Sequence, residues 1–133
     1  MRIKVRNGAD IELVAAGSRP EPPRTVEAQA LVDTSAVKLY LQSSVVRQLG
    51  LRPLGTVRSR TMSDRTEERR VFSPADLEIQ GRSGRFDVIE VPDTLPNVVG
   101  QIPLEDMDWV VDLPGQRLIP NPEHKEGVLY DEF

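Results

Sequence analysis

Residues 25–36 read TVEAQALVDTSA, and the interpretation of the whole chain starts from this stretch. Apolar residues at positions 26, 28, 30 and 32 alternate with polar ones, which predicts a strand over residues 25–32 with one apolar face. The strand then delivers Asp33-Thr34-Ser35-Ala36 into a bend. A carboxylate at the end of a buried strand costs free energy unless something uses it or satisfies it. An Asp that accepts hydrogen bonds from its own turn is the common structural alternative, so the tetrapeptide alone leaves both interpretations open.

The composition limits the classes of function. With 133 residues the chain is long enough for one domain with a modest core. A net charge of -4 gives no reason to expect binding to nucleic acid or to an anionic membrane. The absence of cysteine excludes disulfides, thiol nucleophiles and thiolate metal sites. The single histidine, His124, argues against a Ser-His-Asp relay and against a typical zinc site.

The hydropathy pattern predicts a soluble, cytoplasmic protein. No apolar run reaches about 18 residues, the length that a membrane-spanning helix needs. The first residues, MRIKVR, carry charges where a signal peptide needs an apolar core.

Short strands account for most of the remaining pattern. Besides residues 25–32, we expect extended segments at residues 3–5, 11–15, 38–41, 75–80, 86–91, 98–100, 109–111 and 117–119. Turns are expected at Asn7-Gly8, at residues 81–84, at Asp93-Thr94 between two prolines, and as a type II turn at residues 113–116.

Two short helices are expected. Ser43 is a plausible N-cap for a helix over residues 44–49, which Gly50 can end in the left-handed conformation. Pro103 suits the first position of a one-turn helix that buries Leu104 and Met107. The polar, acidic segment after residue 120 is expected to be loose.

The order of these features resembles the retroviral-type aspartic proteases, and most closely their small bacterial single-lobe members. The resemblance rests on the strand before Asp33-Thr34-Ser35-Ala36, the helix ending in residues 48–51 (QLGL), and a polar hairpin over residues 58–71. It continues through Val98-Val99-Gly100, the run VGQIPLE at residues 99–105, and RLIPNP at residues 117–122. Asp-Thr-small-small is weakly specific alone and more specific when an apolar-apolar-Gly segment follows in this topology.

The resemblance implies an all-β fold with one or two short helices, a single-lobe retropepsin-like acid protease β-barrel that functions as a homodimer. The protease domain would span residues 1–122, with a polar tail at residues 123–133. Each protomer would supply one catalytic Asp33, and no metal or cofactor would be needed. The partners expected are a second copy of the chain and a peptide or protein substrate, with no nucleic acid and no membrane.

The resemblance also assigns roles to the residues around Asp33. We call the loop that contains Asp33-Thr34-Ser35-Ala36 the motif loop. Thr34 would hydrogen-bond across the dimer to the motif loop of the other protomer, and Ala36 would line the floor of the cleft. The polar hairpin would be a flap that closes over substrate, and Gly100 would permit close backbone packing behind the motif loop. The tip of this flap would be Met62, Ser63, Asp64, Arg65 and Thr66. A solvated hairpin without a gating role is the alternative for this segment.

Ser35 departs from the family pattern, which has glycine at the third motif position. Glycine lets the backbone pass close to the carboxylate, whereas serine adds a side chain that can hydrogen-bond Asp33 or intrude on the cleft. Two functions therefore stay open: an aspartic endopeptidase, and a catalytically inactive homodimer that binds peptides in the same cleft.

Two clusters of charged residues are weaker candidates for a functional site. Glu105, Asp106, Asp108 and Asp112 could invite calcium, but their spacing fits no EF-hand loop, and a solvated turn is the simpler interpretation. Arg69-Arg70 is too short, and too well balanced by Glu67-Glu68, to indicate a nucleic-acid surface.

Overall fold

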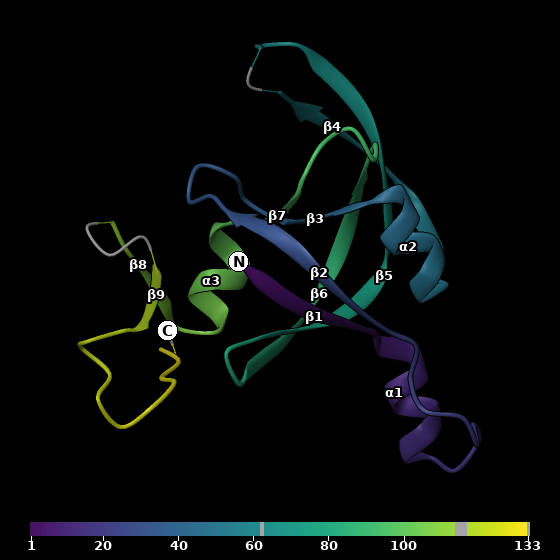
Figure 1. Ribbon diagram of the computed structural model, residues 1–133, viewed down its shortest axis with the longest axis horizontal. Helices are drawn as coiled ribbons and strands as arrows, with labels where there is room; N and C mark the ends of the chain where they lie inside the picture. Colours follow the sequence, from purple (N-terminus) through teal and green to yellow (C-terminus); the bar gives the residue numbers. More distant parts are fainter. Residues whose placement is uncertain (62, 114–116, 133) are drawn as a thin grey trace.

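The chain forms a closed β-barrel from which a long hairpin projects, and a separate two-stranded sheet lies beside the barrel (Figure 1). The computed structural model describes residues 1–61, 63–113 and 117–132. Nine strands lie in the described part of the chain: β1 (Arg2–Asn7), β2 (Thr25–Val32), β3 (Leu39–Gln42), β4 (Pro53–Arg60), β5 (Thr66–Ile79), β6 (Arg82–Val91), β7 (Asn97–Val99), β8 (Trp109–Asp112) and β9 (Arg117–Pro120). The described helices are α1 (Gly8–Ala15), α2 (Ser43–Leu49) and α3 (Gln101–Asp106). The all-β class expected from the sequence is confirmed.

Closure of the barrel follows from one extra strand pairing. The sheet has the order β1-β2-β7-β3-β6-β5-β4, and β1 also pairs with β5, which joins the two ends of a six-stranded ring. Strand β4 stays outside the ring, and among the described strands it pairs with β5 alone. Most neighbours are antiparallel, but β2 pairs with β7 and β3 with β6 in parallel.

Alternating apolar residues fill the barrel. On β5, Ala75, Leu77 and Ile79 are buried, as the sequence pattern predicts. Neighbouring strands contribute further side chains that are almost fully buried: Ile3, Val5, Leu39, Leu41, Val88 and Val99. Because successive side chains of a strand point to opposite faces, the strands of the six-stranded ring turn alternate residues toward this interior.

The segment after β1 is a helix, which corrects the expected turn and strand at residues 7–15. Asn7 is the N-cap of α1: its side-chain oxygen accepts a hydrogen bond of 3.0 Å from the backbone N–H of Asp10. Its amide nitrogen donates to the carbonyl of Leu49 at 2.8 Å. The missed signal is the N-cap spacing Asn7 to Asp10, which the Asn-Gly turn preference obscured.

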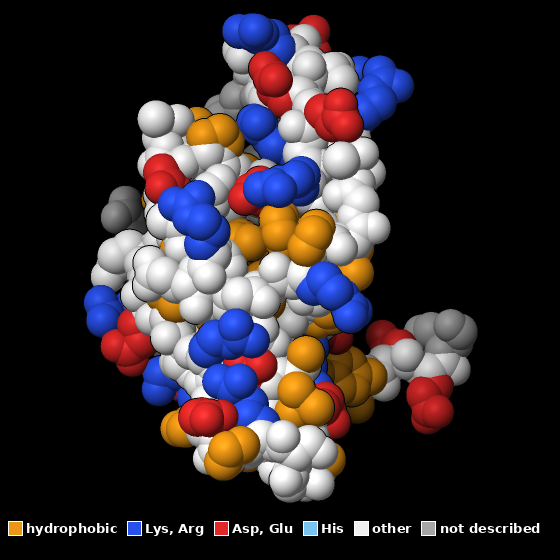
Figure 2. All heavy atoms as spheres, turned by 90° about the vertical axis from the view of Figure 1, so that its right-hand side faces the viewer, with side chains coloured by type: hydrophobic (Ala, Val, Ile, Leu, Met, Phe, Trp, Pro, Cys, Tyr) orange, Lys and Arg blue, Asp and Glu red, His pale blue; other side chains and the backbone are white. Residues whose placement is uncertain are grey.

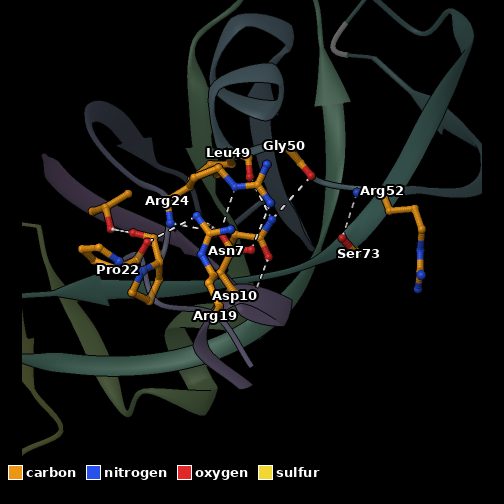
Figure 3. A network of polar contacts seen from close by, with 11 residues as sticks. Asn7, Asp10, Arg19, Pro22, Arg24, Leu49, Gly50, Arg52 and Ser73 are labelled. Atoms are coloured by element: carbon orange, nitrogen blue, oxygen red, sulfur yellow. Dashed lines mark hydrogen bonds and ion pairs between the residues drawn. The ribbon is translucent and has the colours of Figure 1, made fainter. Parts of the chain in front are cut away.

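A partly buried ion pair, in which only the carboxylate is fully covered, fastens α1 to the chain that follows it (Figure 3). Asp10 is 2% exposed and accepts bonds from Arg24 Nε at 2.8 Å and from Arg24 Nη2 at 2.9 Å. The hydrogen bonds from Arg24, opposed by burial, lower the pKa of Asp10 to about 2. Asp10 is therefore ionised at any physiological pH and holds the loop of residues 16–24 against α1.

Three local details also differ from the sequence-based expectation. Gln42, not Ser43, is the N-cap of α2; the Ser43 hydroxyl donates to the carbonyl of Val91, and Asp93 accepts from the N–H of Ser44. Pro103 is the third residue of α3 rather than the first, because Gly100 is its N-cap. The hairpin between β5 and β6 turns at Gln80-Gly81, both with positive φ, and residues 82–84 already belong to β6.

The tail is tied to the body of the protein through Asp108, contrary to the expected loose segment and to the expected solvated turn at the acidic cluster. Asp108 is 7% exposed and accepts hydrogen bonds from Asn121 Nδ2 at 3.1 Å and from the N–H of Leu129 at 3.3 Å. His124 Nδ1 is also in hydrogen-bond contact with its carboxylate. Burial raises the pKa of Asp108, but these hydrogen bonds outweigh it and keep the pKa below its ordinary value.

Some expectations fall on residues outside the described part. These are Met62 at the tip of the polar hairpin and residues 114–116 of the expected type II turn. None of the helices in the described ranges is long and apolar enough to cross a membrane.

Candidate active site

The loop of residues 33–38 is held by a ladder of backbone hydrogen bonds to residues 99–102. Asp33 N–H donates to the carbonyl of Val99 at 3.1 Å, and Gly100 N–H donates to the carbonyl of Lys38 at 2.8 Å. The N–H of Gln101 then donates to the carbonyl of Ala36 at 2.8 Å. The first bond extends the β2–β7 pairing and the second extends the β3–β7 pairing, so together they fix the position of Asp33 relative to the barrel.

Gly100 lies against this loop so closely that no side chain fits. A Cβ atom at this position would lie 2.6 Å from the carbonyl oxygen of Lys38 and 2.8 Å from the carbonyl of Ala36. The backbone of Gly100 has φ -91°, which any residue can adopt, so the requirement for glycine is one of space.

Ser35 donates two hydrogen bonds to one oxygen of the Asp33 carboxylate. The Ser35 hydroxyl donates to Asp33 Oδ1 at 2.6 Å, and the backbone N–H of the same residue donates to that oxygen at 2.9 Å. Both bonds stabilise the ionised form and lower the pKa of Asp33, against a smaller opposing effect of burial. The second oxygen, Oδ2, accepts no hydrogen bond from a described side chain, and the backbone N–H of Ala36 lowers the pKa of this carboxyl by less than the bonds from Ser35 do.

Thr34 and Ala36 are the neighbours of Ser35 in the chain, and their side chains differ in exposure. Thr34 is exposed, and its side chain makes no hydrogen bond within the described ranges. Ala36 is half-buried and lies at the edge of a groove that also reaches Asp33.

The groove, with a volume of about 820 Å³, runs between the motif loop and the β4–β5 hairpin. Apolar residues form one side of it: Leu31, Val37, Tyr40, Leu95, Pro96 and Val98. The hairpin forms the other side, with Arg58, Arg60, Thr61, Ser63, Arg65 and Arg69 among its lining residues. Asp33 thus lies in a trough with an apolar wall and a polar, arginine-rich wall.

The tip of the hairpin is closed by hydrogen bonds within itself. Thr61 N–H donates to the carbonyl of Arg65 at 2.8 Å, and Asp64, at φ 58°, donates its N–H to the carbonyl of Thr61 at 3.0 Å. Ser63 and Arg65 line the groove, whereas Thr66 begins β5 and does not line it. A projecting antiparallel hairpin is therefore present where the sequence places the flap.

Sequence reasoning missed the residues that reach the groove from distant segments. Tyr40 comes from β3 and Leu95-Pro96 from the turn before β7, and neither segment carries a recognisable motif. Only the parallel β3–β6 pairing and the return of β7 beside β2 bring them to the groove. In the described ranges, no group of three or more His, Asp or Glu is arranged to hold a metal ion.

Comparison with known proteins yields a structural match only. No protein-family model matches the chain, and no curated protein matches it at a significant level. Among solved structures, the chain is similar to the retroviral protease-like domain of Ddi1 from Leishmania major, with a TM-score of 0.51 and 17% sequence identity. The match covers 73% of this chain and 81% of the Ddi1 domain. The six-stranded barrel with its projecting hairpin is therefore a retropepsin-like fold.

Proposed function

We propose that the protein is an aspartic endopeptidase that works as a homodimer, built like the small single-lobe bacterial proteases that its sequence resembles. The observation that carries this proposal is the Asp33 carboxylate, fixed at the end of β2 in a groove beneath a projecting hairpin, with one oxygen that no described side chain binds. A retropepsin-like barrel with one such Asp needs a second chain to bring two carboxylates together.

In the proposed dimer the two Asp33 side chains lie side by side across a twofold axis. Two adjacent carboxylates cannot both ionise easily, so one of them holds a proton even though a single protomer favours the ionised form. The ionised Asp33 takes a proton from a water molecule, which attacks the peptide carbonyl. The protonated Asp33 donates a hydrogen bond to the carbonyl oxygen and stabilises the negative charge that develops there.

The residues around Asp33 support this chemistry by position. Thr34 is exposed at the motif loop and makes no hydrogen bond within its own described protomer, so its hydroxyl is available to the partner chain. The β4–β5 hairpin covers the groove and would exclude water once an extended peptide lies beneath it.

Ser35 favours a second candidate, a homodimer that binds peptides without cleaving them. Its hydroxyl bond to Asp33 Oδ1 at 2.6 Å stabilises the ionised carboxylate and makes it a weaker base. It also opposes the sharing of a proton between the two Asp33 side chains.

A cleavage assay separates the two candidates. Wild type, Asp33→Asn and Ser35→Gly are incubated with a diverse peptide pool between about pH 4 and 7, and new peptide termini are identified by mass spectrometry. The peptidase proposal expects cuts by wild type that Asp33→Asn abolishes. Peptide binding without cuts by wild type, with cuts by Ser35→Gly, would establish the binding module instead.

A further inference from the structure

The charge of the groove is opposite to that of the chain. The whole protein has a net charge of -4, yet four arginines line the groove against only Glu67 and Asp33. On the face in Figure 2, in contrast, basic and acidic side chains are interspersed, including at its upper end where the hairpin projects. The groove lining thus carries an excess of positive charge, unlike the chain as a whole.

The strand register shows which arginine faces the groove. Along β5 the half-buried residues are Glu67, Arg69 and Val71, whereas Glu68 and Arg70 are exposed. The face of the hairpin with Arg69 therefore lies over the groove. Arg58 is directly opposite Glu68 and so extends from the other face, at the rim.

Two of the arginines that line the groove, Arg58 and Arg69, have no carboxylate partner among the described residues, and of these two only Arg69 lies on the face over the groove. Arg60 pairs with Asp64 at 3.6 Å, Arg65 with Glu67 at 3.8 Å, and Arg70 with Glu90 at 2.9 Å. Glu67, the acidic residue beside Arg69 on the same face, is therefore engaged by Arg65. Arg69 is half-buried, and its guanidinium can donate hydrogen bonds to a carboxylate of another molecule.

We propose that Arg69 determines substrate specificity by binding an acidic side chain of a peptide in the groove. The substrate class is an extended peptide with an apolar residue against the Leu31 and Val98 wall and an Asp or Glu beneath the flap. A guanidinium binds a carboxylate with two parallel hydrogen bonds, and partial burial strengthens such a pair relative to one in water. This inference rests on the proposed function, since it concerns the same groove.

The test compares three peptides that share one apolar centre and differ only in having Glu, Gln or Lys at the flanking positions. Binding is measured by fluorescence anisotropy on Asp33→Asn protein, and cleavage is measured on wild type. We expect the Glu peptide to bind about tenfold more tightly than the Gln peptide, the effect of one charge-assisted hydrogen-bonded pair. The Lys peptide should bind weakest.

Three variants locate the effect. Arg69→Gln should reduce the preference for Glu over Gln to less than about twofold, and Arg69→Glu should reverse it in favour of Lys. Arg47→Gln removes the same charge from an exposed position on α2 that does not line the groove, and it should keep the full preference.

The outcomes distinguish this inference from the proposed function. If the protein prefers the Glu peptide in binding but cleaves no peptide, the result supports the role of Arg69 and contradicts the proposed peptidase activity. Cleavage without a Glu preference, or a preference that Arg69→Gln leaves intact, overturns the role of Arg69. Absence of binding by all three peptides also overturns it.

Discussion

The hydroxyl of Ser35 controls how basic Asp33 is, because it donates to Oδ1 of that carboxylate. Replacing Ser35 with Gly removes this bond and so raises the pKa of Asp33 toward its ordinary value. Activity that needs an ionised Asp33 falls as the pH drops through this pKa. The acid limb of the kcat/KM profile should therefore move to higher pH in Ser35→Gly. An unchanged acid limb would show that this hydrogen bond does not control the catalytic base.

Asp10 provides a second residue-scale prediction, on stability. Its pKa of about 2 in the folded protein is below the ordinary 3.8. The ionised Asp10 therefore stabilises the folded protein by about 2 kcal/mol. This stabilisation is fully present above about pH 4 and is lost as the pH falls through about 2. Asp10→Asn should lower the free energy of unfolding by about this amount at pH 7, measured by urea denaturation. The difference from wild type should shrink toward pH 2. Asp87→Asn, at an exposed site, is the control and should change little.

At the scale of elements, the contact between the motif loop and the N-terminus of α3 depends on Gly100. A Cβ there would lie 2.6 Å from a backbone oxygen, which cannot rotate away as a side chain can. Gly100→Ala should therefore lower the free energy of unfolding by about 1–3 kcal/mol and displace Asp33. Gly55→Ala in β4 has nothing within 4 Å of the added atom and should leave both stability and cleavage nearly unchanged. Thermal unfolding and cleavage rates test both variants; equal effects would contradict the packing argument.

The elements also show what the sequence can predict. Alternation predicted β2 and the C-terminal half of β5 with their core-facing sides, because one side of each strand packs into the barrel, but it did not predict that β5 continues unbroken from the polar hairpin. The helix α1 was missed because its apolar residues Leu13 and Val14 are exposed, so no buried stripe revealed its period. Asp108 was misjudged because its partners, His124 and Leu129, arrive from the tail only in the folded protein. The groove could not be predicted either, because its lining residues come together through long-range strand pairings that a local sequence pattern does not show.

At the scale of the whole molecule, the proposed site is incomplete in one chain. Cleavage per protein should therefore fall on dilution as the dimer dissociates. Thr34→Ala should raise the dimer dissociation constant by roughly tenfold or more, because two symmetry-related hydrogen bonds are lost. Sedimentation velocity measures this change. Thr94→Ala, in an exposed turn whose threonine side chain makes no described hydrogen bond, is the matched control. A monomer with full activity at all concentrations would contradict the proposed dimer.

The most direct test of the shared site is the cleavage rate of mixtures of wild type and Asp33→Asn at constant total concentration, after the protomers have exchanged. If each working site needs Asp33 from two chains, only wild-type homodimers cleave. The rate should then follow the square of the wild-type fraction. A rate that rises linearly with this fraction would show that one Asp33 suffices, and cleavage by Asp33→Asn alone would show that Asp33 is not catalytic.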